Sequence, residues 1–586
     1  MKFNRLAQLF SKLEDTDKRL EMIEFLSNFF VDIKENKYFE DLDKIIYLLQ
    51  GQLAPNIKQF PKFGLAEKMI IEALKVPSGL NAKEIKKKLI ELGDIGATSA
   101  EILAFRTEKQ SSIRTFIYNK KKEKPSIEIS ELYRKLTEIA KIKGKKAQER
   151  KLRILHKLID AISPLETKYV LRIITSTLRV GIQSPTIIEG LALAFTGNRK
   201  NKELIEKAYS LYPDLGEIST TLAEKGLEEV KKIDIEYGTP ILSMLASREI
   251  YTEFISRLGV PFVAEHKLDG ERLQIHKSGD NIILFSRRLL NISEQYPDVC
   301  QVIRENIQAE NVIIEGEVVA MDPFYEKMLP FQVLSQRRRK YDVEEISKKV
   351  PVCLFLFDLL KFEEESFIDK PLPIRHEKLE EIVEERDELR LVKSVLINSI
   401  DELLDFFNRA RQEGTEGIMA KSIKENSIYQ AGNRGFLWLK LKALEGGKLK
   451  DTVDVVLVGA FFGRGRRKGV YGTYIGAVFD PKNDRFEAFT RVSSGWSDEI
   501  MNTLTKDMKQ YELERRALNV ICEDIPDVWL RPEVVIEIMG DEITISDKFA
   551  SLGYSMRFPV FHRLRPDKLP RDITSVTEIK ELYDTQ

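Results

Sequence analysis

A lysine at position 267 has the sequence setting of a side chain used as a nucleophile. Aliphatic residues precede Lys267 and an alternating apolar pattern follows, which predicts that it lies at the end of a β-strand. A lysine amine held in this way can form covalent intermediates. The Asp269-Gly270 pair behind it is typical of a turn. Taken alone, this short segment favours the plainer interpretation, a solvated lysine before a turn.

Other charged and aromatic side chains follow on expected strands. Glu317 lies within an aliphatic run, Phe357 lies in a run with alternating aromatic residues, and Glu416 stands at a strand start. Lys440 and Lys442 alternate with apolar residues, so their side chains point to one face of a strand. Each has a structural alternative: a salt-bridge partner, a core aromatic residue or an exposed strand face.

Three regions with different patterns of apolar and turn residues must position these side chains. Residues 1–237 place apolar residues at helical spacing, as at Leu155 and Ile159, and predict an all-helical domain. Residues 238–447 contain short β-runs with helical stretches between them, which predicts an α+β domain with antiparallel sheets. Beyond the Gly-Gly pair that closes this range, residues 448–586 contain short strands and Gly-rich turns, which predicts a small β-barrel.

Composition limits the classes of function. The 586 residues include 93 Lys and Arg and 93 Asp and Glu, so the net charge is zero and any nucleic-acid contact must come from local basic patches. The three cysteines and five histidines form no cluster, which argues against a zinc site and a disulfide framework. The sequence starts without a signal-peptide pattern and contains no long apolar run. We therefore expect an intracellular, cytoplasmic protein.

The segments KLDGER, SRR, EGE, FLFD, EGIMAK and WLKLK occur in this order between Lys267 and Lys442. The series resembles the nucleotidyltransferase motifs shared by DNA ligases, RNA ligases and mRNA capping enzymes. It is most similar to ATP-dependent DNA ligases of the archaeal and eukaryotic replicative type. Residues 163–169 and 178–182 resemble that family's DNA-binding domain, and residues 557–568 resemble its last motif. The resemblance implies an all-α DNA-binding domain, an α+β nucleotidyltransferase (adenylation) domain and an OB-fold β-barrel domain.

The resemblance implies sealing of nicked double-stranded DNA in replication, repair and recombination. Lys267 would attack the α-phosphorus of ATP and become lysyl-AMP, with release of diphosphate. AMP would pass to the 5′-phosphate of a nick, and the 3′-hydroxyl would displace it. Because a free lysine has a pKa of ~10.4, neighbouring cations and partial burial must lower the free-energy cost of a neutral amine.

The resemblance also implies which side chains hold the nucleotide. Glu265 would contact the adenine, and Phe357 would stack on it. Glu317 and Glu416 fit hard-oxygen ligation of Mg²⁺, or of Mn²⁺, with ribose contact as the alternative for Glu317. The remaining expected ribose and phosphate contacts are Arg272, Arg287, Arg434, Lys440, Lys442, Arg557, Arg565 and Lys568.

A second partner is suggested by Gln110, Ile113, Phe116 and Ile117. Their spacing resembles the box that docks on sliding clamps, although an ordinary helix or loop start gives the same pattern. We expect a monomer that binds nicked duplex DNA.

Three alternatives remain. An RNA ligase or capping enzyme shares the central motifs, but the large helical region argues against both. A non-catalytic DNA-binding scaffold is opposed by the intact set of charged motif residues. NAD as the cofactor is disfavoured, because the NAD-dependent ligases carry a four-cysteine zinc finger that three scattered cysteines cannot supply. Use of ADP or GTP beside ATP stays open.

Overall fold

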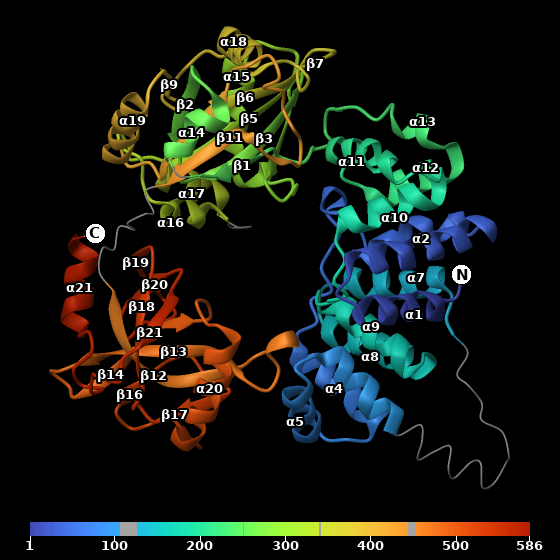
Figure 1. Ribbon diagram of the computed structural model, residues 1–586, viewed down its shortest axis with the longest axis vertical. Helices are drawn as coiled ribbons and strands as arrows, with labels where there is room; N and C mark the ends of the chain where they lie inside the picture. Colours follow the sequence, from blue (N-terminus) through green and yellow to red (C-terminus); the bar gives the residue numbers. More distant parts are fainter. Residues whose placement is uncertain (106–125, 250, 339–341, 443–451, 586) are drawn as a thin grey trace. The chain divides into compact units, whose positions relative to one another are not determined.

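The computed structural model describes residues 1–105, 126–249, 251–338, 342–442 and 452–585 (Figure 1). It divides into two compact units, one of Met1–Leu65 with Lys124–Lys442 and one of Ala66–Glu123 with Ala443–Gln586. The predicted clamp-binding box and the Gly-Gly pair expected between the second and third regions lie outside the described residues. No helix in the described part of the chain is long and apolar enough to cross a membrane.

The N-terminal region is helical, as predicted. Its helices are α1 (Phe3–Glu14), α2 (Arg19–Glu35), α3 (Leu42–Leu49), α4 (Glu67–Ser78), α5 (Ala82–Leu92), α7 (Ile129–Lys141), α8 (Ala147–Ala161), α9 (Pro164–Ile174), α10 (Ser184–Thr196), α11 (Lys202–Leu211), α12 (Leu215–Lys225) and α13 (Leu227–Val230). The start of α9 is fixed by a capping box, in which Ser163 and Glu166 satisfy each other's backbone N–H groups. The motif-like segment at 163–169 therefore begins a well-defined helix.

Glu14 joins the end of α1 to α9. Its carboxylate accepts from Lys168 Nζ at 2.7 Å and Arg172 Nη2 at 2.9 Å. Tyr169 donates its hydroxyl hydrogen to Glu14 at 2.9 Å. Burial opposes ionisation, but the two cations outweigh it and lower the pKa of Glu14 from 4.5 to about 2. The carboxylate therefore stabilises the folded state above pH 4.5, and this contribution is lost as the pH falls toward 2.

Glu14→Gln is accordingly expected to lower the free energy of unfolding by about 1–3 kcal/mol at neutral pH. The deficit should shrink when the comparison is repeated at pH 3.5, because part of the wild-type carboxylate is then protonated in the unfolded chain. Urea unfolding followed by circular dichroism measures both values. A deficit of equal size at both pH values would show that packing, and not charge, is responsible.

The central region contains two sheets. The five-stranded sheet has the order β1-β11-β10-β2-β9, and the six-stranded sheet has the order β4-β3-β5-β6-β7 with β8 paired to β6. The strands are β1 (Leu245–Arg248), β2 (Phe262–Lys267), β3 (Glu271–Ser278), β4 (Asn281–Ser286), β5 (Asn311–Ala320), β6 (Val352–Phe362), β7 (Glu365–Ser366), β8 (Leu389–Leu391), β9 (Ser394–Ile397), β10 (Gly417–Ser422) and β11 (Arg434–Lys442).

The prediction of purely antiparallel sheets is wrong at two places. The pairs β1·β11 and β6·β8 are parallel, whereas the other pairs in these two sheets are antiparallel. Each parallel pair joins strands that are distant in sequence. Local alternation indicates a strand, but it does not indicate which distant strand will lie beside it or in which direction.

Helices cover these sheets from outside. The helices of the region are α14 (Phe254–Leu258), α15 (Pro297–Asn306), α16 (Phe331–Leu334), α17 (Val343–Lys349), α18 (Leu372–Ile382) and α19 (Ile400–Gln412). Val299 and Ile303 of α15 and Leu379 of α18 pack into the core of the six-stranded sheet. Leu403 and Phe406 of α19 pack into the core of the five-stranded sheet. The chain passes from one sheet to the other between β2 and β3, directly after Lys267.

The C-terminal region is rich in β-structure, as predicted. Its main sheet has the order β15-β17-β12-β13-β14-β16, with β18 paired to β12 and β21 paired to β18, and β19 and β20 form a separate pair. The strands are β12 (Val453–Phe462), β13 (Tyr471–Asp480), β14 (Arg485–Val492), β15 (Glu512–Leu513), β16 (Val520–Ile521), β17 (Val528–Leu530), β18 (Val535–Met539), β19 (Glu542–Ile545), β20 (Tyr554–Arg557) and β21 (Val560–Leu564). The helices are α20 (Asp498–Met508) and α21 (Val576–Thr585).

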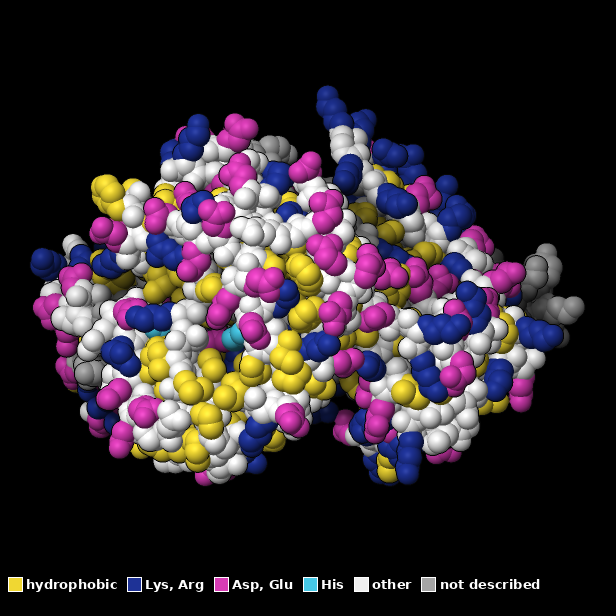
Figure 2. All heavy atoms as spheres, turned by 90° about the horizontal axis from the view of Figure 1, so that it is seen from above, with side chains coloured by type: hydrophobic (Ala, Val, Ile, Leu, Met, Phe, Trp, Pro, Cys, Tyr) yellow, Lys and Arg dark blue, Asp and Glu magenta, His cyan; other side chains and the backbone are white. Residues whose placement is uncertain are grey.

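Lys and Arg side chains are scattered together with Asp and Glu over the face seen in Figure 2, with hydrophobic side chains gathered toward its lower left. This pattern agrees with the zero net charge of the sequence. Recognition of a charged ligand must therefore depend on where individual side chains lie.

Candidate active site

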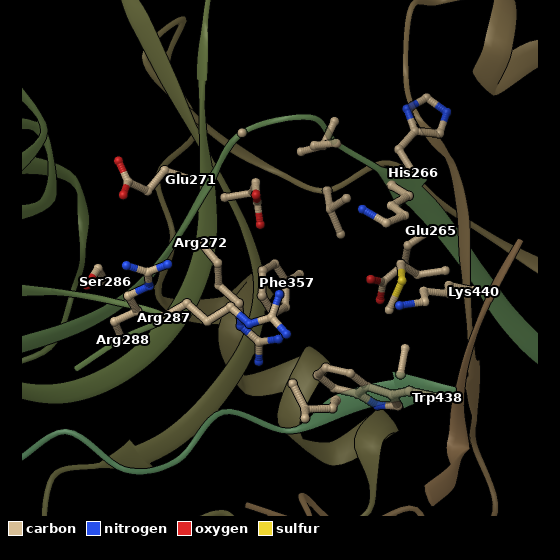
Figure 3. A pocket seen from close by; sticks show the side chains of 18 of the residues that line it. Glu265, His266, Glu271, Arg272, Ser286, Arg287, Arg288, Phe357, Trp438 and Lys440 are labelled. Carbon is tan, nitrogen blue, oxygen red and sulfur yellow. The ribbon is translucent and has the colours of Figure 1, made fainter. Parts of the chain in front are cut away.

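A pocket of about 810 Å³ lies in the central region, lined by residues from both of its sheets. Side chains from several strands converge on it, among them Glu265, Arg272, Phe357 and Lys440 (Figure 3). Lys267 lines the same pocket. The predicted nucleophile and the predicted base contacts, which are far apart in the sequence, are thus brought together.

Lys267 is fixed at the end of β2. Its backbone lies opposite Gly417 of β10, and its carbonyl accepts a hydrogen bond from the Glu416 N–H at 2.9 Å. The Nζ atom lies 2.5 Å from Glu416 Oε2. The Lys267 side chain keeps 21% of its surface exposed, so a ligand in the pocket can reach it.

Gly270 lies in the turn between β2 and β3, where the backbone of β5 leaves no room for a side chain. A Cβ atom at this position would lie 2.2 Å from the Val318 carbonyl oxygen and 2.9 Å from Glu317 Cγ. A side chain would therefore push β5 away from the turn. The close approach places the strand that carries Glu317 against the turn that follows Lys267.

Glu317 lies among charges of both signs. Burial raises the pKa of its carboxyl group from 4.5 to about 7, and the carboxylates of Glu416 and Asp269 act in the same direction, whereas Lys267 and Arg272 oppose the shift. The carboxyl group thus changes charge near neutral pH. A divalent cation would favour its ionised form.

No group of three or more His, Cys, Asp or Glu side chains within the described ranges is arranged to hold a metal ion by itself. Glu317 and Glu416 are the two carboxylates that the sequence predicts for this purpose. The Glu416 carboxylate contributes to the raised pKa of the Glu317 carboxyl group, so the two carboxylates interact electrostatically.

Arg272 is anchored beneath the aromatic part of the pocket. Its Nη2 lies 2.6 Å from Glu315 Oε2, and its Nη1 donates to the Met244 carbonyl at 2.9 Å. The guanidinium carbon lies 5.2 Å from the centroid of the Phe357 ring and 5.7 Å from that of Trp438. Its Nε is buried without a hydrogen-bond partner. The anchored guanidinium therefore keeps one donor for a ligand.

Phe357 and Trp438 form the aromatic wall. Their ring centroids are 6.3 Å apart and the rings are nearly perpendicular, at 79°. The backbone of Phe357 is held by Lys421 Nζ, which donates to its carbonyl at 3.1 Å, and by His376 Nε2 at 3.0 Å. The next residue, Asp358, forms a buried two-pronged ion pair with Arg375. These contacts hold the part of β6 that carries the Phe357 ring in place.

Three family models match the chain in order along its length. Residues 2–192 match "DNA ligase N terminus", residues 243–442 match "ATP dependent DNA ligase domain" and residues 467–568 match "ATP dependent DNA ligase C terminal region". The chain belongs to the ATP-dependent DNA ligase family. The pocket lies in the segment that matches the ATP-dependent domain.

Relatives that align with the whole chain are named DNA ligase. A protein named DNA ligase from Acidianus ambivalens is 39% identical over 594 residues, which cover 100% of this chain and 98% of its own. Another from Sulfolobus acidocaldarius is 40% identical over 595 residues, with 100% and 98% covered. Among solved structures, one titled Pmar-Lig_PreS3 aligns with a TM-score of 0.55 at 17% identity over 96% of this chain and 99% of that chain, a likeness of fold alone.

Some of the other predicted site residues of the ligase line the pocket, and others do not. Arg287, Arg434 and Lys440 line the pocket. Lys442 pairs with Gly417 through the backbone, and its side chain is outside the described part.

The predicted contacts of the last motif belong to the other compact unit, where carboxylates hold them. Arg557 Nη1 lies 2.8 Å from Glu542, and Arg565 Nη1 and Lys568 Nζ lie 3.1 and 2.6 Å from Asp454. No local pattern in the sequence indicates these carboxylate partners.

Sequence reasoning missed several side chains in or beside the pocket, among them the four named next. Trp438 and Lys421 line the pocket, and Glu315 and His376 hold groups that do. Lys421 belongs to the EGIMAK segment, and alternation along β10 puts it on the same face as Met419, but the position of Met419 opposite Glu265 is visible only in the fold. His376 lies on a helix with no motif around it, and no local signal marks it.

Proposed function

We propose that this ligase joins nicks in duplex DNA through an AMP group attached to Lys267, in replication, repair and recombination. The observation that carries the proposal is the position of Lys267 Nζ, in the pocket and 2.5 Å from Glu416. The amine nitrogen forms a bond to the α-phosphorus of ATP, and the bond from this phosphorus to the bridging oxygen breaks. Diphosphate leaves with the bonding pair, and the amine gives up a proton.

The pocket supports this attack electrostatically. Glu416 holds the resting ammonium of Lys267 in place, so the nucleophile does not have to be ordered when ATP binds. Arg272, Arg434 and Lys440 add positive charge to the same pocket. This positive charge stabilises the negative charge that develops on the phosphoryl group during the attack.

The aromatic end of the pocket suits adenine. Phe357 offers a ring for stacking, and Glu265 Oε1 is a buried acceptor without a hydrogen-bond partner. The 6-amino group of adenine is the donor that such an atom requires. Arg272, Arg287, Arg434 and Lys440 then lie along the walls available to the ribose and phosphates.

A divalent cation, Mg²⁺ or Mn²⁺, would be held by Glu317 and Glu416 together with the phosphates. When bound, such an ion neutralises phosphate charge and polarises the phosphorus–oxygen bonds. Ribose contact is the alternative role for Glu317.

We also propose the functional boundaries 1–237, 238–447 and 448–586 for a DNA-binding, an adenylation and an OB-fold domain. In the last of these, β12 pairs with β13, β17 and β18, which is compatible with a sheet that curls toward a barrel. Arg557, Arg565 and Lys568 are proposed to orient the diphosphate during adenylation. For that task they would exchange Glu542 and Asp454 for phosphate oxygens.

The substrate is tested with matched nicked duplexes made of DNA and of RNA, each labelled at the 5′-phosphate of the nick. The ligase is expected to join the DNA duplex and to release AMP, with little product from the RNA duplex. Joining of RNA alone would indicate an RNA ligase. Binding to nicked DNA without any joining, in the presence of ATP and Mg²⁺, would indicate a non-catalytic scaffold.

A further inference from the structure

A buried lysine lies at the base-binding end of the pocket, and the catalytic steps above do not use it. Lys421 of β10 has a side chain that is 1% exposed, and its Nζ lies 2.7 Å from Oε2 of Glu265, which is 3% exposed. The same Nζ lies 4.9 and 4.5 Å from the ring centroids of Phe357 and Trp438. Burying an ion pair is expensive, so one at this place requires a reason beyond packing.

The second oxygen of Glu265 supplies an independent observation. Oε1 is buried and has no hydrogen-bond partner, although Glu265 lines the pocket. The nearest recorded basic group is His376 Nε2 at 3.5 Å, which also lies 3.0 Å from the Phe357 carbonyl oxygen. A buried acceptor without a donor is rare in a folded protein, and at a ligand pocket it indicates a group that the ligand must satisfy.

His376 does not replace Lys421 as the counter-charge. Burial lowers the pKa of His376, so its imidazole is neutral at neutral pH. A neutral ring with the proton on Nε2 donates to the Phe357 carbonyl, which is the shorter of its two contacts. Lys421 is then the positive charge recorded in contact with the Glu265 carboxylate, at 2.7 Å.

Other charged side chains line the same pocket as Glu265, among them Lys267, Arg272 and Lys440. The residues opposite Glu265 in the sheet are Met419 of β10 and Ser394 of β9. Behind His376, Arg375 is committed to Asp358 through two hydrogen bonds. Among the described residues, Lys421 and His376 are the recorded ionic contacts of Glu265.

We propose that Lys421 is a specificity-determining positioning residue that makes the ligase select a purine nucleotide with an amino group at C6. By donating to Oε2, Lys421 fixes the carboxylate and leaves the unpartnered Oε1 to accept a hydrogen bond from the base. Adenine offers a donor there, whereas the 6-oxo group of guanine or hypoxanthine offers an acceptor that the carboxylate repels. The inference rests on the proposed function, in which the base of ATP lies against Glu265.

Without Lys421 this discrimination is lost. A buried carboxylate without its cation takes up a proton at neutral pH, because an unpaired buried charge is unfavourable. A protonated carboxyl group can donate as well as accept. It therefore tolerates a 6-oxo purine that the ionised group rejects.

The test compares formation of the lysyl-nucleotide from ATP and from inosine triphosphate, both labelled at the α-phosphate, in wild type, Lys421→Met and Lys421→Arg. The quantity measured is the ratio of kcat/KM for the two nucleotides, from which the fraction of active protein cancels. At pH 7 we expect the ratio to fall roughly tenfold or more in Lys421→Met, as for a lost charged hydrogen bond. It should recover toward the wild-type ratio as alkaline buffer ionises the carboxyl group, and Lys421→Arg should keep it throughout.

Three results separate the possibilities. An unchanged ratio in Lys421→Met at all pH values would overturn the inference, and so would equal losses in the Met and Arg variants, which would indicate packing. If Lys421→Met does not fold, Lys421→Gln replaces it under the same criteria, because glutamine fills the site and can donate to Oε2 without a charge. Failure of the wild-type protein to form any adduct with ATP would instead overturn the proposed function.

Discussion

Lys267→Ala is expected to abolish formation of the lysyl-AMP adduct and to lower nick sealing at least ~10⁴-fold, as for loss of a covalent nucleophile. Lys267 ends β2 with its Nζ beside Glu416 in the pocket. Lys421 cannot take its place, because it is buried in an ion pair with Glu265. Incubation with ATP labelled at the α-phosphate, followed by denaturing electrophoresis, measures the adduct directly.

Two controls make this result specific. Lys393 lies beside β2, since its carbonyl accepts from the His266 N–H at 3.1 Å, but its side chain is 57% exposed. Lys393→Ala should therefore form the adduct like wild type. A nick that already carries AMP on its 5′-phosphate should still be sealed by Lys267→Ala, because that step does not need the amine as a nucleophile. Substantial labelling of Lys267→Ala would refute the assignment.

Glu317→Gln is expected to slow adduct formation about 100- to 1000-fold, as for removal of one group that stabilises the charge of a transition state. The amide keeps the shape of the side chain but loses the charge that would hold a divalent cation. Steady-state rates over a range of Mg²⁺ concentrations measure the loss. Glu365→Gln, on the edge strand β7 of the same sheet and paired only with Lys370 among recorded ion pairs, should behave like wild type.

The same substitution should make the metal-free protein more stable. Because burial raises the pKa of Glu317 from 4.5 to about 7, its contribution is fully present below pH 4.5 and is lost as the pH rises through 7. Glu317→Gln cannot ionise, so above pH 7 it should unfold with a free energy about 1–2 kcal/mol higher than wild type. The difference should vanish near pH 4.5, and thermal unfolding in chelator at both pH values checks this. A variant that is both slower and less stable would indicate a structural role for Glu317.

The strand end that carries Lys267 is predicted from local evidence, whereas its role as nucleophile comes from the order of the later motifs and stays a proposal. An aliphatic strand, a turn and the order of later motifs are all visible without the fold, and the structure does place Lys267 at a strand end. The reason for Gly270 is not local. It becomes clear only when β5 is seen to approach within 2.2 Å of where a Cβ atom would lie.

Partners of charged residues are harder to predict than the residues themselves. Arg565 could be read from its motif, but its partner Asp454 lies 111 positions earlier in the chain. Lys421 and Glu265 form a pair only because β10 lies antiparallel to β2. Nothing in either segment states this pairing, and the parallel pair β1·β11 was missed for the same reason. Sequence patterns therefore predict the chemical groups, whereas long-range strand pairing decides which of them meet.

The central claim is that Lys267 carries the AMP group, and mapping the modified residue tests it most directly. Wild-type protein would be incubated with ATP and Mg²⁺, digested at neutral pH and sequenced by mass spectrometry. The account predicts a single AMP group on the peptide that contains Lys267, in a phosphorus–nitrogen linkage that is lost in acid. AMP on Lys421, Lys440 or any other residue, or an acid-stable linkage, would contradict it.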